Sequence, residues 1–280
     1  MFDVPRVVPK QTYTPPGTIW LKDNLFIDKA EVPNVGYREF IYSINQQHRR
    51  RSYCDSMLPD TLVWGNRRLR GLYAAYYYLR HPYYQDYPVV GISYYQALEF
   101  CKWRTQQVNY FVAITKKLAT WDPATIYMGV QYVKYRLPTD KEWDYAASAG
   151  LNHCQYPFGY ERIIDKNNIE VSNTAEYSNL FFQKSKCYSD TANAGDSIYY
   201  DGCVQSVFFG EPNKYGIYNM LGNVSEIIAD STIKGLSYRD FLNGPNSHEE
   251  HFEYDYTIDF PYKGPRAWLG FRCIAEVLKQ

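Results

Sequence analysis

The chain has 280 residues, 45% of them hydrophobic, and its 30 basic residues balance 30 acidic ones. This apolar content excludes disorder as the main state, and the length fits one large domain or at most two small ones. Because the net charge is zero, no overall field draws the chain to nucleic acid or anionic lipid. Partners must therefore be recognised by shape and local contacts.

The first 16 residues contain four prolines and no hydrophobic period, and we predict a tail or tether there. Residues 17–280 are predicted to form a single domain. No run reaches the roughly 20 apolar residues of a membrane span, and the first residues lack a signal-peptide pattern. We expect a soluble chain, either cytoplasmic or exported with its leader removed.

Hydrophobic patterning predicts two short strands, over 19–21 and 25–27. Asn34 is placed to cap a following helix, whose apolar face would be Val35, Phe40, Ile41 and Ile44. A second helix is expected from Tyr94, capped by Ser93, running past Val108 towards Leu118 and carrying Cys101 in its buried stripe. Thr139 and Glu142 have capping-box spacing for a third helix, which ends at Gly150.

Two surface features stand out. The basic run at 48–51, with further arginines at 67, 68 and 70, is interpreted either as a nucleic-acid patch or as a solvated face with local ion pairs. Tyrosine is unusually common, at 30 residues, and suits protein contacts as well as a tyrosine-rich core. Seven tyrosines lie between Gly71 and Tyr87, so we place a docking surface there. Its candidate residues are Tyr76, Tyr77, Tyr78, Tyr83 and Tyr84.

The six cysteines are widely spaced and form no CxxC pair, which excludes zinc-ribbon and thioredoxin-like sites and leaves up to three disulfides open. Residues 151–210 show little periodicity, so we expect a metal ion or a disulfide to hold them in place. Cys187 and Cys203 could close a disulfide there, around acidic and amide side chains that could bind calcium. A polar loop with neither is the alternative.

Four blocks along the chain together resemble the formylglycine-generating-enzyme, or sulfatase-modifying-factor, family. They span 87–94, 135–143, 215–226 (Tyr-Gly-Ile-Tyr-Asn-Met-Leu-Gly-Asn-Val-Ser-Glu) and 269–273 (Leu-Gly-Phe-Arg-Cys), and the resemblance extends over about 26–275. It implies an α+β fold of decorated C-type-lectin-like architecture with little regular secondary structure. Within the family, the segments 58–64 and 78–83 look most like the gliding-motility lipoproteins J and K of the Bacteroidota type IX secretion system.

Active members of this family oxidise a peptide cysteine to formylglycine with copper held by two cysteines. In this chain Asp240 and Pro245 stand at the matching positions, and neither can replace a thiolate on copper(I). The resemblance therefore implies a protein that is not an enzyme and binds no copper. His248 and His251 could form a different metal site, with a polar loop as the alternative.

The resemblance also implies structural sites. Calcium would be bound by Asn219, Gly222, Val224 and Glu226, and a second, weaker calcium site would involve Asn179, Leu180, Asp196 and Asp201. Cys101 would pair with Cys273 in a disulfide, which favours export to the periplasm or cell surface.

Taken together, the high tyrosine content and the missing cysteines favour a non-catalytic scaffold subunit. The resemblance implies that it is associated with the outer membrane, in a type IX secretion or gliding-motility complex. Its partners would be other outer-membrane or secretion-system proteins and not nucleic acid. It would reach the membrane only through a lipid anchor that this chain does not contain. The alternatives are a glycan- or peptide-binding lectin-like module and a metal-dependent enzyme with altered chemistry.

Overall fold

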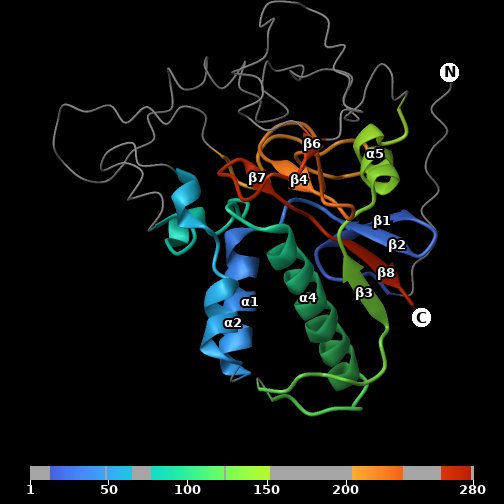
Figure 1. The fold of residues 1–280 in the computed structure, drawn as a ribbon. Helices are drawn as coiled ribbons and strands as arrows, with labels where there is room; N and C mark the ends of the chain where they lie inside the picture. Colours follow the sequence, from blue (N-terminus) through green and yellow to red (C-terminus); the bar gives the residue numbers. More distant parts are fainter. Residues whose placement is uncertain are drawn as a thin grey trace, which may run out of the picture.

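The computed structural model describes residues 13–47, 49–64, 77–122, 124–151, 204–235 and 260–278. Short strands alternate with helices (Figure 1), which agrees with the predicted α+β class and its low content of regular structure. The lectin-like label stays a prediction. The elements are β1 (Thr18–Lys22), β2 (Leu25–Asp28), α1 (Asn34–Gln46), α2 (Arg51–Ser56), η1 (Thr61–Trp64), η2 (Pro82–Tyr84), α4 (Tyr94–Thr115), β3 (Val133–Arg136), α5 (Asp140–Ser148), β4 (Ser225–Ile227), β5 (Thr232–Lys234), β6 (Phe260–Pro261), β7 (Leu269–Gly270) and β8 (Ile274–Val277).

The first sheet joins the two ends of the described chain. Its strand order is β1-β2-β8-β3, and all neighbours are antiparallel. Strands β1 and β2 confirm the predicted pair, with Asp23 in the left-handed turn between them (φ 46°). The late strand β8 pairs Ile274 with Ile27 on one side and with Arg136 on the other. It therefore lies inside the sheet.

The second sheet has the order β6-β5-β4-β7, and β4 runs parallel to β7. This pairing sets Glu226 opposite Gly270. A Cβ atom at Gly270 would lie 3.0 Å from the Val224 side chain and 3.1 Å from the Val89 carbonyl oxygen. The close approach explains why glycine stands beside Glu226.

Helix starts follow the predicted signals in two cases and depart from them in one. Ser93 and Gln96 cap α4 reciprocally, at 3.1 and 2.7 Å, and Glu142 accepts from the Thr139 amide at 2.9 Å at the start of α5. The prediction for Asn34 was wrong, because Asn34 is the first residue of α1 and Pro33 precedes it as the cap position. The Asn34 amide donates instead to the carbonyl oxygens of Tyr78 and Tyr84.

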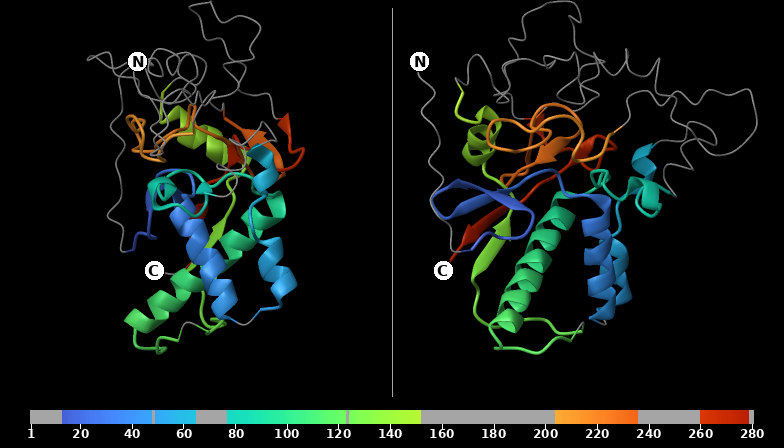
Figure 2. Two further views of the ribbon diagram at one scale, coloured as in Figure 1. Left: turned by 90° about the vertical axis from the view of Figure 1, so that its left-hand side faces the viewer. Right: turned by 180° about the vertical axis from the view of Figure 1, so that it is seen from behind.

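Helices α1 and α4 lie side by side and cover the first sheet (Figure 2). Their aromatic side chains meet in the core, where the rings of Phe40 and Phe100 are 5.8 Å apart and those of Phe100 and Phe271 are 5.4 Å apart. Cys101 is buried in this core, as predicted, and Val35 and Ile41 are only half-buried. Within the described ranges, none of the helices has both the length and the hydrophobicity of a membrane span.

Candidate functional site

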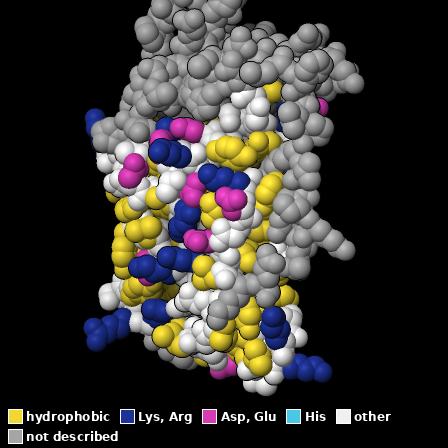
Figure 3. Space-filling model, turned by 90° about the vertical axis from the view of Figure 1, so that its right-hand side faces the viewer, with side chains coloured by type: hydrophobic (Ala, Val, Ile, Leu, Met, Phe, Trp, Pro, Cys, Tyr) yellow, Lys and Arg dark blue, Asp and Glu magenta, His cyan; other side chains and the backbone are white. Residues whose placement is uncertain are grey.

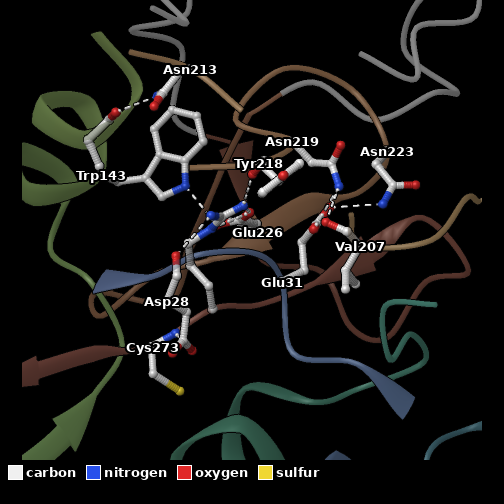
Figure 4. Close-up of polar contacts among 12 residues, drawn as sticks. Asp28, Glu31, Trp143, Val207, Asn213, Tyr218, Asn219, Asn223, Glu226 and Cys273 are labelled. Carbon is white, nitrogen blue, oxygen red and sulfur yellow. Dashed lines mark hydrogen bonds and ion pairs between the residues drawn. The ribbon is translucent and has the colours of Figure 1, made fainter. Parts of the chain in front are cut away.

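The interior between the two sheets holds a buried ion pair between Glu226 on β4 and Arg272, which lies between β7 and β8. The Arg272 Nε atom donates to both carboxylate oxygens at 2.8 Å, and its Nη2 lies 2.6 Å from Oε1. Trp143 on α5 adds a hydrogen bond to Oε2 at 2.8 Å (Figure 4). The side chains of Arg272 and Glu226 are almost fully buried, with exposed fractions of 0% and 1%. Both oxygens of the Glu226 carboxylate therefore accept hydrogen bonds from protein donors.

The remaining donors of Arg272 connect further segments. Nη2 donates to the Tyr218 carbonyl oxygen at 2.9 Å, and Nη1 donates to the Asp28 carbonyl oxygen at 3.4 Å. Burial would lower the pKa of Arg272, but the carboxylate of Glu226 outweighs burial and raises it. The guanidinium stays charged and links β2, β4 and the segment before β4.

A second carboxylate, Glu31, lies in the same interior without such a partner. It is 1% exposed, and its two oxygens accept from the side-chain amides of Asn219 and Asn223, each at 3.0 Å (Figure 4). Burial raises the pKa of Glu31 to about 8. The nearby negative charge of Glu226 also raises this pKa, whereas the positive charge of Arg272 lowers it. Near neutral pH, Glu31 is therefore mostly a neutral acid.

Asp28 makes the third polar centre. Its Oδ2 accepts from Arg104 on α4 at 2.7 Å and from the Cys273 amide at 2.9 Å. The Arg104 guanidinium also lies 4.3 Å from the centre of the Tyr135 ring. This contact ties α4 to the centre of the first sheet.

The predicted calcium ligands lie in a tight, partly left-handed segment, since φ is 53° at Asn219, 83° at Gly222 and 58° at Asn223. The side-chain oxygen of Asn219 is buried and has no hydrogen-bond partner among the described residues, which suits an oxygen-seeking cation. Glu226 differs, because Arg272 already supplies its positive charge. Of the predicted calcium ligands, Asn219 therefore suits a calcium ion, whereas Glu226 does not.

Two of the predicted cysteines lie together. The Sγ atoms of Cys101 and Cys273 are 3.6 Å apart and fully buried, with both thiols free. Burial raises the pKa of the Cys273 thiol, and the neighbouring Cys101 adds to this effect. The structure therefore brings the predicted partners into contact, and the bond itself stays a prediction.

The predicted docking surface is only partly a surface. Tyr83 and Tyr77 are exposed, but Tyr78 is buried and its hydroxyl donates to the Pro88 carbonyl oxygen at 2.6 Å. Tyr84 packs edge-on against Tyr83, with ring centres 5.0 Å apart. Tyr78 was therefore wrongly assigned to a docking surface, because its ring packs into the core beneath this segment.

Several predicted residues lie outside the described ranges, and no three His, Cys, Asp or Glu residues within those ranges are grouped as metal ligands. The predicted residues outside the described ranges are Tyr76, Asn179, Leu180, Cys187, Asp196, Asp201, Cys203, Asp240, Pro245, His248 and His251.

A groove of about 670 Å³ opens between α1 and α4, lined by Trp103 and Gln107 among others.

Sequence reasoning assigned no role to Glu31, Trp143 or Arg272, although they form much of the buried network. A signal exists for Glu31, since this acidic residue stands between the apolar residues Ala30 and Val32. Such a residue is buried only with polar partners. The partners themselves lie up to 192 positions away, at Asn223, and no local pattern names them.

Comparison with known proteins finds similar sequences and solved structures. Over 91% of this chain, the formylglycine-generating enzyme of Mus musculus is 22% identical, and the match covers 67% of that enzyme. The inactive C-alpha-formylglycine-generating enzyme 2 of Bos taurus is 25% identical over 58% of this chain and 42% of its own length. Among solved structures, Treponema denticola variable protein 1 is 14% identical with a TM-score of 0.46, covering 94% of this chain and 92% of that one.

The relatives include both an enzyme and an inactive protein, so the match alone does not decide activity. The model of the sulfatase-modifying factor enzyme 1-like domain matches residues 4–277. With nearly its whole length matched, the chain belongs to the family of the sulfatase-modifying factor enzyme 1-like domain.

Proposed function

We propose that the chain is a non-catalytic member of this family and a scaffold subunit of an outer-membrane or periplasmic complex, of the type IX secretion or gliding-motility kind. The observation that carries this proposal is the presence of Asp240 and Pro245 at the two positions where the family resemblance places copper-binding cysteines. Soft copper(I) requires thiolates, which neither side chain provides. The existence of an inactive relative shows that loss of activity occurs within the family.

The buried network supports a structural role for the polar residues that the structure describes. Glu226, Arg272 and Trp143 satisfy one another and have almost no contact with solvent. The described cysteines, Cys54 and the 101/273 pair, are buried as well. A substrate peptide reaches none of these groups without unfolding the domain, so they stabilise the fold.

The absence of activity is tested with the purified full chain, copper(I) and a cysteine-containing peptide. We expect no formylglycine and no stoichiometric copper. The matched variant, Asp240→Cys combined with Pro245→Cys, asks whether thiolates alone restore copper binding. Turnover by the unmodified protein would overturn the non-catalytic assignment.

The scaffold role is tested separately, by capturing the tagged full chain from its native envelope and identifying co-purifying proteins by mass spectrometry. Recovery of envelope proteins in fixed stoichiometry is expected. Tyr83→Ala, which alters an exposed tyrosine, should weaken recovery if residues 77–84 form the docking surface. Recovery of the chain alone would contradict the scaffold proposal.

Export is proposed from the adjacent thiols of Cys101 and Cys273, because disulfides persist in oxidising compartments. Peptide mapping without reductant, on protein from the native host, should find these two residues linked. Closing so long a loop would add about 2–5 kcal/mol of stability. Two free thiols in that protein would contradict both the bond and the argument for export.

A calcium site is proposed at Asn219, with the backbone carbonyls of Gly222 and Val224, on the strength of the unpartnered Asn219 oxygen. Glu226 joins such a site only by exchanging its bonds to Arg272. Because a ligand that binds only the folded state stabilises it, excess calcium should raise the melting temperature relative to excess chelator. Identical melting, with no calcium by elemental analysis, would remove the metal.

A further inference from the structure

The segment 116–131, which follows α4, exposes an unusual number of apolar side chains. Of fifteen large hydrophobic residues that are exposed in the described ranges, five belong to this segment. Met128 is 86% exposed and Trp121 is 65% exposed. Isolated exposed apolar residues are ordinary, but a contiguous group marks an interaction site. The other three are Leu118 (65%), Ile126 (40%) and Val130 (45%).

This segment is held in place by its own contacts. The buried ring of Tyr110 on α4 stacks on Trp121 at 5.6 Å and on Tyr127 at 5.7 Å between ring centres. The Tyr110 hydroxyl also donates to the Thr120 carbonyl oxygen and accepts from the Asp122 amide. Because Tyr110 holds the backbone at Thr120 and Asp122, the segment is fixed against α4 while its apolar side chains remain exposed.

Basic residues gather at the same end of the molecule. Helices α1 and α4 both run towards it, so the turn between α1 and α2 and the segment after α4 lie at one end (Figures 1 and 2). The turn carries Arg49, Arg50 and Arg51, and the segment begins with Lys116 and Lys117. Figure 3 draws the face at the right-hand side of Figure 1, and hydrophobic side chains lie there together with Lys or Arg side chains in the lower part.

The local charge is strongly positive although the whole chain is neutral. Residues 49–51 and 116–131, called the basic-apolar end below, carry five basic residues and one acidic residue, Asp122. Arg51 lies 3.7 Å from Asp55, but 93% of its side chain is exposed, so this pair does little to neutralise it. The arginines at 49–51, whose role is ambiguous from sequence, thus lie at the same end of the molecule as a group of exposed apolar side chains.

We propose that the basic-apolar end docks on the surface of an anionic lipid bilayer. Trp121 and the aliphatic side chains would enter the boundary between headgroups and acyl chains, where tryptophan is favoured. The arginines and lysines would contact lipid phosphates. A protein interface fits less well, since lysine is depleted at the centre of such interfaces. This inference is independent of the scaffold proposal, because it rests on different residues.

The test is co-sedimentation of the full chain with two kinds of vesicle, pure phosphatidylcholine and phosphatidylcholine mixed with phosphatidylglycerol. Binding to the anionic vesicles should be at least about tenfold tighter and should weaken with salt. Removing one cation, by Arg50→Gln or Lys117→Gln, should weaken binding about fivefold. The matched control is Lys102→Gln, a similarly exposed lysine on α4 outside this end.

The apolar contribution is tested by Leu118→Ser combined with Met128→Ser, which should weaken vesicle binding at least about tenfold. Both side chains are exposed, so the melting temperature should stay unchanged and report an intact fold. Leu62→Ser, which alters a side chain that is 81% exposed on η1, is the control for an exposed apolar side chain elsewhere. Equal binding to both vesicle types, or unchanged binding by the double variant, would overturn the proposal. Loss of a captured protein in the double variant, without any vesicle binding, would reassign this end to a protein interface.

Discussion

Two regions of the buried interior handle negative charge in opposite ways. Around Glu226, the Arg272 guanidinium and the Trp143 indole both contact the carboxylate, and the guanidinium brings a full positive charge. Around Glu31, the side-chain donors are the neutral amides of Asn219 and Asn223, and burial raises the pKa to about 8. Both side chains are 1% exposed, so burial alone does not explain the difference.

The comparison teaches that equally buried carboxyl groups can be accommodated by donors of different charge, and that neutral donors leave the cost of burying a charge largely uncompensated, as the raised pKa of Glu31 indicates. Two amide hydrogen bonds satisfy the oxygens of Glu31 but do not offset the loss of water around a full charge. At Glu226 the donor is a guanidinium, which adds an opposite charge to the hydrogen bonds. Three changes would break or sharpen this contrast.

The largest effect is expected from Arg272→Met. It leaves Glu226 as an unpaired charge in the interior, so the free energy of unfolding should fall by about 3–5 kcal/mol, measured by urea denaturation. The control Arg51→Met removes an arginine from an exposed pair and should cost less than about 0.5 kcal/mol. Adding Glu226→Gln to Arg272→Met should recover part of the loss. A cost below about 1 kcal/mol for Arg272→Met would show that the ion pair with Glu226 contributes little to stability.

An intermediate effect is expected from Asn219→Gly, which removes the donor shared by Glu31 and the Val207 carbonyl oxygen. The free energy of unfolding should fall by about 1–3 kcal/mol because buried acceptors lose a partner. Asn219→Ala should cost roughly 1–2 kcal/mol more, since φ at this position is 53°. Thermal or urea unfolding would measure both. Equal costs for the two variants would argue against the left-handed geometry.

The smallest effect is expected from Glu31→Gln at pH 6, below about 1.5 kcal/mol, because the wild-type side chain is already neutral there. The pH dependence is more informative. The unfolded chain releases this proton near pH 4.3 and the folded chain near pH 8, so the folded state binds more protons between these values.

Stability of the wild-type chain should therefore fall as pH rises through this window, and the fall should be complete above about pH 8. Glu31→Gln should flatten that part of the curve of unfolding free energy against pH, measured in urea from pH 5 to pH 9. Parallel curves for the two proteins would mean that Glu31 does not carry the raised pKa.

Local signals in the sequence were enough to predict the first strand pair and the capped helices. The contacts at Ser93 and Thr139 span only three residues each, which is why a short motif identifies them. Asn34 has the same kind of side chain but a different outcome. Its amide is taken by carbonyl groups 44 and 50 residues away, and no local pattern indicates such partners.

The candidate site was predicted less completely for the same reason. Glu226 was selected as a calcium ligand, but its principal partner, Arg272, lies 46 positions along the chain. Tyrosine content likewise predicted a surface, and only packing separates the buried Tyr78 from the exposed Tyr83. The adjacent pair Cys101 and Cys273 was anticipated through the family resemblance, not through any spacing rule.

The inside position of β8 in the first sheet affects when the protein can fold during its synthesis. Asp28 and Cys273, which are hydrogen-bonded across this sheet, are 245 residues apart. In a nascent chain, Asp28 of β2 leaves the ribosome 245 residues before Cys273, which directly precedes β8. Contacts of such long range also form slowly. Strands β1 and β2 therefore cannot complete the first sheet until the last strand has been synthesised, and β2 leaves an edge open to other strands in the meantime.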